Sequence, residues 1–190
     1  MENFKAHLEK FITISDDEFE SISSYFQMIE FKKKQNLMVE GEISKFKYFV
    51  VHGCLRKFFI NEKGVEQTTE FAIENWWLAD NEAFEQQRSS QFYIQAVENS
   101  TIVMIDFHSQ KKLLENHPVM EKYFRMVYQR AYAAAEKRIR YLYEMSKEDY
   151  YIQFSTKYPW FIQRIPQYLL ASFLGLTPEY LSEIRAKLRS

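Results

Sequence analysis

The stretch that decides the fold is RIPQYLLASFLGLTPEYLSEIRAKLRS, residues 164–190. It holds two segments with apolar residues at helical spacing, 166–174 and 178–188, and Gly175 stands between them. A glycine just past the last periodic residue ends a helix, and Thr177 followed by Pro178 is a strong helix start. Two helices joined by so short a turn predict a helix-turn-helix.

The second of these helices has two different faces. Leu181, Ile184 and Leu188 share the apolar face. A DNA-reading helix places its N-terminal residues against base edges, and basic residues beside them hold phosphates. Many helical hairpins read nothing, but the turn spacing, the Thr-Pro start and the basic tail favour DNA. The candidate DNA-binding residues are Thr177, Pro178, Glu179, Ser182, Glu183, Arg185, Lys187 and Arg189.

A long helix is expected upstream, because residues 119–145 contain neither glycine nor proline and Pro118 suits a first turn. At 1.5 Å per residue it would span roughly 40 Å. Its apolar residues recur at three- and four-residue steps, as in a coiled coil. Packing on its own domain is the alternative, but this length favours a dimer. The predicted seam is Met120, Phe124, Val127, Ala131, Ala135, Ile139 and Leu142.

Short strands are expected between residues 27 and 106. This region is rich in β-branched and aromatic residues and is broken by turns. The sequence NEKG, residues 61–64, predicts a hairpin in which Gly64 has a positive φ. Closely spaced strands of this kind predict an antiparallel roll or barrel. Further along, PWFIQRIP, residues 159–166, is interpreted as a short hairpin.

Composition excludes several classes of protein. No apolar run reaches the length of a membrane span, and the charged N-terminus lacks the apolar centre of a signal peptide, so a cytoplasmic protein is expected. The net charge is −1, but residues 1–110 carry 11 Lys/Arg against 18 Asp/Glu and residues 111–190 carry 14 against 8. A basic second half suits a polyanion partner, although chance would also give such an asymmetry.

Metal and redox centres have little support in the sequence. The single cysteine, Cys54, excludes a cysteine-ligated iron–sulfur cluster, and its strand-like surroundings predict a buried thiol. The four histidines, His7, His52, His108 and His117, lack the spacing of metal ligands. No catalytic glycine motif is present, so we expect no metal, no certain cofactor and no enzyme.

Taken together, these motifs resemble the Crp/Fnr family of transcription regulators. The resemblance rests on VEGE, VHGCLRKFF, FYIQAVENSTIVMI, the long helix before MSKEDYYIQFSTKYP, and the closing helix pair. It implies an α+β fold: an antiparallel β-roll effector domain with N-terminal helices in 1–117, a dimerisation helix in 118–145 and a winged helix-turn-helix in 146–190. It also implies double-stranded DNA and a second copy of the chain as partners, with RNA polymerase and a small-molecule effector as further candidates.

Two departures from the family pattern stand out. Cyclic-nucleotide-binding members carry a Gly-Glu pair, a short helix and an arginine that neutralises the phosphate. Here the pair is missing and Ser90 takes the arginine position, so a cyclic nucleotide is not expected. Arg88, two residues away, would need a local shift to serve in its place. The second departure is Glu183, where close relatives usually have arginine; glutamate accepts from cytosine instead of clamping guanine. The residues at the candidate ligand site are Asp80, Asn81, Glu82, Arg88, Ser89 and Ser90.

The sequence therefore predicts a dimeric regulator of Crp/Fnr type that binds DNA and does not depend on cyclic AMP. The rival prediction is a ligand-binding or protein-interaction module of the same fold whose helix pair no longer reads DNA. Glu179 and Glu183 support this rival, because carboxylates near phosphates weaken DNA binding.

Overall fold

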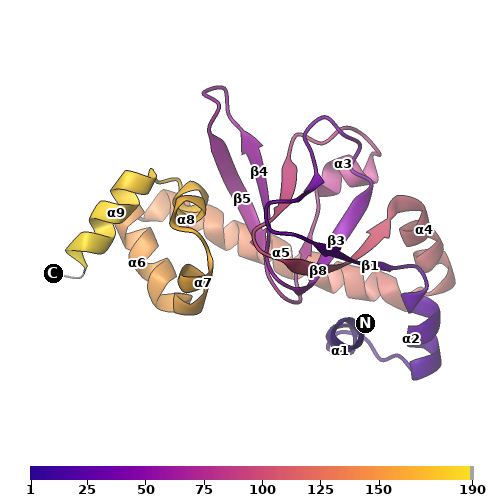
Figure 1. Ribbon diagram of the computed structural model, residues 1–190. Coiled ribbons are helices and arrows are strands. Elements are labelled where there is room, and N and C mark those ends of the chain that lie inside the picture. The colour runs from indigo at the N-terminus through magenta and orange to yellow at the C-terminus, as the bar shows by residue number, and fades with distance from the viewer. Residues whose placement is uncertain (189–190) are drawn as a thin grey trace. The chain divides into compact units, whose positions relative to one another are not determined.

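The computed structural model describes residues 1–188, which fall into two compact units. Unit 1 comprises Met1–Phe59 and Glu70–Arg130; unit 2 comprises Ile60–Thr69 and the chain from Ala131 onward. The elements, most of them labelled in Figure 1, are α1 (Glu2–Leu8), α2 (Asp16–Ser23), β1 (Gln27–Phe31), β2 (Asn36–Met38), β3 (Phe46–His52), β4 (Leu55–Ile60), β5 (Glu66–Ala72), β6 (Trp77–Leu78), α3 (Asn81–Glu85), β7 (Tyr93–Ala96), β8 (Ser100–Asp106), α4 (Phe107–Asn116), α5 (Val119–Glu144), α6 (Lys147–Lys157), α7 (Pro159–Arg164), α8 (Gln167–Leu174) and α9 (Pro178–Lys187).

Two four-stranded sheets form the roll that the sequence predicts. One has the strand order β1-β8-β3-β6 and the other β2-β7-β4-β5. Every strand pairing with a resolved register is antiparallel. The expected hairpin joins β4 to β5, and Gly64 lies in it with φ 74°. This confirms the antiparallel roll and the position of one of its turns.

The roll has an apolar core on each side of the β3 sheet. On the inner side, Tyr48 and Val50 meet Leu55 and Ile94 from the other sheet. On the other side, Phe49 packs with residues of α1, α2, α4 and the first turns of α5. Alternation along a strand produces this division, because successive side chains point to opposite faces. Cys54 is fully buried, as its surroundings predict.

Local sequence signals explain where the helices begin. Ser15 and Glu18 form the capping box at the start of α2, each side chain bonding the other's backbone amide. Ser146 accepts from the amide of Asp149 and so caps α6.

Among the described residues, no helix combines the length and apolarity that a membrane span requires.

The prediction of a hairpin at residues 159–166 is wrong. Pro159–Arg164 forms helix α7 instead, with Pro159 in the first turn. Proline is well suited to that position because its missing N–H would have no helical partner there. The described part of unit 2 beyond Ala131 is therefore helical between its turns, and it contains no strand that could serve as a wing.

Candidate functional site

The turn between α8 and α9 has the geometry that its sequence predicts. Gly175 is left-handed, with φ 69° and ψ 31°, and the amide of Leu176 donates to the Ala171 carbonyl over 2.9 Å. Thr177 then caps α9, because its hydroxyl accepts from the amide of Tyr180 over 3.2 Å. The left-handed residue and the cap fix both helix ends within a few residues, which makes the turn tight.

A small core holds the two helices together. Leu181 and Ile184 of α9 are fully buried against α8 and α6. Ala171, also fully buried, has the small side chain that close helix packing requires. Leu188, which shares their face in sequence, is instead 53% exposed just beyond α9. The inner face of α9 is thus committed to packing, and its outer face is free for another role.

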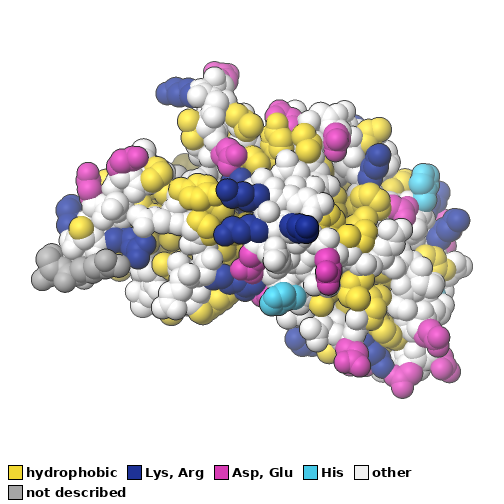
Figure 2. Space-filling model, viewed as in Figure 1, with side chains coloured by type: hydrophobic (Ala, Val, Ile, Leu, Met, Phe, Trp, Pro, Cys, Tyr) yellow, Lys and Arg dark blue, Asp and Glu magenta, His cyan; other side chains and the backbone are white. Residues whose placement is uncertain are grey.

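The outer face of α9 carries most of the candidate DNA-binding residues. Glu179, Ser182 and Glu183 are exposed, and Figure 2 shows acidic side chains over the first half of the helix. Thr177, Pro178 and Lys187 are exposed as well. Sequence reasoning missed Tyr180, which is 37% exposed in the first turn of α9. It also missed Tyr168, which is 52% exposed at the start of α8.

Arg185 and Arg189 stand apart from that group. Arg185 is half-buried and donates from Nη1 to Gln167 Oε1 over 2.9 Å, so it ties α9 to the first turn of α8. Arg189 lies outside the described residues. Within the described part of α9, Lys187 is therefore the exposed basic residue from the predicted set.

Unit 2 also includes the tip of the β4–β5 hairpin, which bonds to α8. Ser172 Oγ accepts from the amide of Thr68 and donates to the carbonyl of Glu66, both over 2.8 Å. Arg138 of α5 adds a second link, because its guanidinium donates to the carbonyls of Thr69 and Phe173. The guanidinium also lies 4.0 Å from the centre of the Phe173 ring. Residues far apart in sequence thus hold α8 in place.

The candidate ligand residues divide into a buried pair and an exposed group. Asp80 is 9% exposed and Ser90 is 2% exposed, and Ser90 Oγ donates to Asp80 Oδ2 over 2.8 Å. The other Asp80 oxygen accepts from the amide of Ala83 and so caps α3. A carboxylate therefore lies beside Ser90, the residue that the sequence predicts at the position of the neutralising arginine, and a carboxylate repels a phosphate.

The remaining candidates in this segment lie at the surface. Arg88 pairs with Glu82 over 2.5 Å, and both side chains are more than half exposed. Asn81 and Ser89 are exposed too. An exposed ion pair of this kind contributes little energy, about 0–1 kcal/mol. Arg88 is thus paired at the surface with a residue in the first turn of α3.

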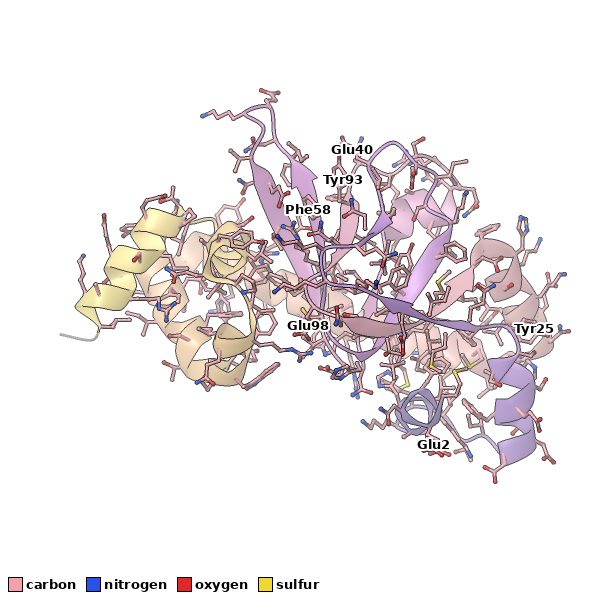
Figure 3. The ribbon with its side chains drawn as sticks, in the orientation of Figure 1. Glu2, Tyr25, Glu40, Phe58, Tyr93 and Glu98 are labelled. Atoms are coloured by element: carbon pink, nitrogen blue, oxygen red, sulfur yellow. The ribbon has the colours of Figure 1, made fainter. Side chains whose placement is uncertain are left out.

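Arg56 and Phe58 of β4 make a row of polar and aromatic contacts with neighbouring strands. Phe58 stacks on Tyr93 of β7, with ring centres 4.9 Å apart (Figure 3). Arg56 lies 3.9 Å above the Phe58 ring and donates twice to Gln95 Oε1. Gln95 in turn donates to Asn36. These contacts link three neighbouring strands and fix the sheet that forms one wall of the roll.

The predicted dimer seam changes its environment along α5. Met120 and Phe124 are 0% and 6% exposed, because they belong to the core of unit 1. Val127 is half-buried against the same core. The remaining members, Ala131, Ala135, Ile139 and Leu142, are all exposed, the last two by 54% and 52%. Only this second part of the seam is therefore available to a partner.

No group of three His, Cys, Asp or Glu side chains in residues 1–188 is arranged to hold a metal ion.

His7 is 7% exposed and is surrounded by aromatic rings, including those of Phe11, Phe49 and Tyr123. Its pKa is lowered to about 4, mainly by burial and to a lesser extent by the positive charges of Lys10 and Arg130.

Comparison with known proteins identifies the roll. Residues 28–117 match the family described as Cyclic nucleotide-binding domain. The match includes all the strands from β3 to β8 together with α3, the segment that carries Asp80 and Ser90. No curated protein sequence matches the chain.

Solved structures extend the likeness to the whole chain. FixK2 from Bradyrhizobium japonicum is 15% identical with a TM-score of 0.68, and the match covers 86% of this chain and 84% of that one. The Catabolite Activator Protein of Thermus thermophilus is 17% identical with a TM-score of 0.57, covering 93% and 84%. The c-di-GMP responsive global regulator CLP of Xanthomonas campestris is 11% identical with a TM-score of 0.71, covering 92% of each.

These structures are Crp/Fnr-type regulators, so the expected resemblance to that family is confirmed for the fold. The combination of a cyclic nucleotide-binding roll, a long helix and a C-terminal helix pair is confirmed with it. All three identities are below 20%. At this level a structural likeness shows the fold and does not show which ligand a protein binds.

Proposed function

We propose that this protein is a homodimeric transcription regulator that binds double-stranded DNA through α9 and does not depend on cyclic AMP. One observation carries the proposal. In unit 2, α9 is capped, packed on one face and exposed on the other, and it follows α8 after a turn built on a left-handed glycine. This is the arrangement in which a recognition helix enters the major groove.

Base contacts fall to the first turns of α9. Glu179, Ser182 and Glu183 are the exposed polar residues there, and Tyr180 adds a hydroxyl and a ring. A carboxylate reads cytosine by accepting from its N4 amino group. Lys187, further along the helix, supplies charge for phosphate contacts. The preferred site should therefore contain cytosine at a fixed position in each half.

Dimerisation falls to the exposed part of the α5 seam. Ala131, Ala135, Ile139 and Leu142 repeat at four- and three-residue steps, which is the spacing of a two-helix contact. Small residues at the first two positions allow close approach, and the larger ones fill the second half. Two-fold symmetry then places two α9 helices about 34 Å apart, which requires a palindromic operator.

Independence from cyclic AMP rests on the buried Asp80–Ser90 pair. A cyclic phosphate entering there would meet a carboxylate that already has a donor from Ser90 and another from Ala83. Calorimetry should detect no binding of cyclic AMP at physiological concentrations. A micromolar dissociation constant would contradict this part of the proposal. RNA polymerase and an effector of another kind stay predictions of the family resemblance.

Selection of bound sequences from random DNA, at a stated salt concentration, tests the proposal. We expect an imperfect palindrome whose half-site centres lie about one helical turn apart. An interaction module of the same fold is the second candidate, and it is favoured by the acidic Glu179 and Glu183 on the face that would meet phosphates. Failure to enrich any sequence at low salt would favour that module.

A further inference from the structure

Two lysines contact the segment around α3, residues 79–92, which we call the α3 segment. Lys47 comes from β3 and Lys57 from β4, so each sheet of the roll supplies one. Lys47 is 2% exposed, and the Lys57 side chain is 15% exposed. Lysine is rarely buried to this degree unless it is paired, so these two positions call for a reason.

Lys57 contacts the start of the α3 segment. On β4 it pairs in register with Ile94, which is fully buried in the roll core. Its Nζ donates to the carbonyl of Ala79 over 3.0 Å and pairs with Glu70 of β5 over 2.8 Å. The ammonium also lies 5.5 Å from the centre of the Phe92 ring. A single cation therefore contacts both ends of the segment and the neighbouring strand.

Lys47 contacts α3 itself from the other sheet. Its Nζ pairs with Glu85, the last residue of α3, over 2.7 Å. The ammonium lies 4.4 Å from the centre of the Phe84 ring and 5.2 Å from that of Tyr128 on α5. Burial lowers the pKa of Lys47, and the bond and charge of Glu85 oppose that shift. Lys47 thus links α3 to the helix that carries the dimer seam.

Each of the two lysines has a carboxylate partner within the roll, Glu85 for Lys47 and Glu70 for Lys57. Where cyclic-nucleotide-binding relatives bring an anion to a protein cation, this chain brings its own carboxylates to its own lysines. In each pair the lysine is buried and the carboxylate is partly exposed, by 56% for Glu85 and 40% for Glu70. Burying the lysine costs desolvation, which offsets the attraction, so such a pair adds little net stability but favours one arrangement over others. An effector would not be needed to position the α3 segment here.

We propose that Lys47 and Lys57 act as built-in substitutes for an effector, holding the α3 segment in place in the absence of any ligand. The substitution of an effector rests on the proposed function as a regulator, whereas the holding of the segment does not. Both lysines are positioning residues, since neither is assigned a contact with DNA.

Amide hydrogen exchange on Lys47→Met and Lys57→Met tests the holding. Methionine keeps most of the side-chain volume and removes the charge, so neither variant should leave a large cavity. We expect exchange in residues 79–92 to accelerate about tenfold or more, because each variant loses a charged hydrogen bond, while β1 and β8 keep their protection. Lys63→Met, at the exposed hairpin tip, is the matched control and should change nothing.

Global stability separates this role from a merely structural one. A buried ion pair replaced by an apolar side chain often leaves the melting temperature unchanged or raises it. A melting temperature that holds while residues 79–92 lose protection supports the proposal. Wild-type protection throughout residues 79–92 in both variants would overturn it. Should Lys47→Met fold poorly, Glu85→Gln removes the same pair from the more exposed side, and the same two outcomes decide.

DNA binding is measured separately on the same variants. If the wild type binds its selected operator, the Lys47→Met, Lys57→Met double variant should bind it at least tenfold more weakly without a ligand. Equal affinity would overturn the role as effector substitute even if exchange accelerates. If the wild type binds no DNA, the proposed function fails, and hydrogen exchange still decides whether the lysines hold the segment.

Discussion

The backbone amide of Thr68 donates a 2.8 Å hydrogen bond to Oγ of Ser172 in α8. The same hydroxyl donates to the Glu66 carbonyl, so one side chain satisfies two backbone groups of the β4–β5 hairpin. The hairpin joins strands β4 and β5 of the roll, whereas Ser172 belongs to α8, the first helix of the candidate DNA-binding pair. Within unit 2 the hairpin tip is therefore part of the structure that supports α8.

Replacing Ser172 with alanine should remove both bonds and leave the Thr68 amide, which is mostly buried, without this acceptor. We expect unit 2 to lose about 1–3 kcal/mol of stability, the cost of an unsatisfied buried donor. Urea unfolding monitored on unit 2 is the measurement. Ser182→Ala, on the exposed face of α9, is the control and should cost less than about 0.5 kcal/mol. Equal effects of the two variants would show that the hairpin contact contributes nothing.

Buried His7 predicts a loss of stability in mild acid. Its pKa is about 4 in the folded protein and near 6.5 when exposed, so the unfolded state takes up a proton first as the pH falls. The free energy of unfolding should therefore be unaffected by His7 above pH 6.5 and should decline between pH 6.5 and 4. Lys10 and Arg130 are positively charged and the Tyr123 hydroxyl is uncharged, so none of these groups stabilises a protonated His7.

His7→Phe tests this assignment, because phenylalanine suits the aromatic surroundings and cannot take up a proton. Its stability should change less than that of the wild type between pH 6.5 and 4. His108→Phe, at an exposed position, should keep the wild-type pH dependence. A His7→Phe profile that parallels the wild type would assign the acid sensitivity to other groups.

The exposed part of the α5 seam predicts that two substitutions dissociate the dimer. Ala131→Glu and Ala135→Glu would bury charges between two helices, which costs desolvation free energy. Light scattering should report a dimer for the wild type at micromolar concentration and a monomer for the double variant. Ala133→Glu, exposed on the opposite side of α5, should remain dimeric. A monomeric wild type would remove the basis of the dimer proposal.

Glu183→Arg should tighten DNA binding and change its base preference. The substitution removes a negative charge beside phosphates and supplies a fork that can clamp guanine. We expect preference at one position in each half-site to move toward guanine, with discrimination of about 1–3 kcal/mol. Lys187→Ala should instead weaken binding to all sequences about equally. Unchanged affinity and preference in Glu183→Arg would mean that α9 does not lie in the groove as proposed.

Local patterns predicted most of the fold. Gly175, Thr177 and Pro178 each act within one turn of the chain, so their sequence alone determined the ends of α8 and α9. Ser15 and Ser146 did the same for α2 and α6. The hairpin prediction for residues 159–166 was wrong, because Pro159 occupies the first turn of α7, where a proline is compatible with a helix.

Tertiary packing decided what periodicity could not. The apolar spacing of α5 is continuous, yet Phe124 is buried in the core of unit 1 and Ala135 is exposed, because that core includes only the first turns of the helix. The positions of Lys47 and Lys57 were likewise invisible to sequence reasoning. A lysine in a strand is ordinarily expected at the surface, and only the three-dimensional placement of Glu85 and Glu70 explains why these two are mostly buried.

Fluorescence anisotropy with a selected operator tests the central proposal of a dimeric DNA reader most directly. The titration uses the palindromic duplex, the same duplex with one half-site scrambled, and a series of salt concentrations, all without cyclic AMP. We predict two chains per duplex, at least tenfold weaker binding to the scrambled duplex, and affinity that falls steeply as salt rises. Equal affinity for both duplexes, or no binding even at low salt, would contradict the proposal.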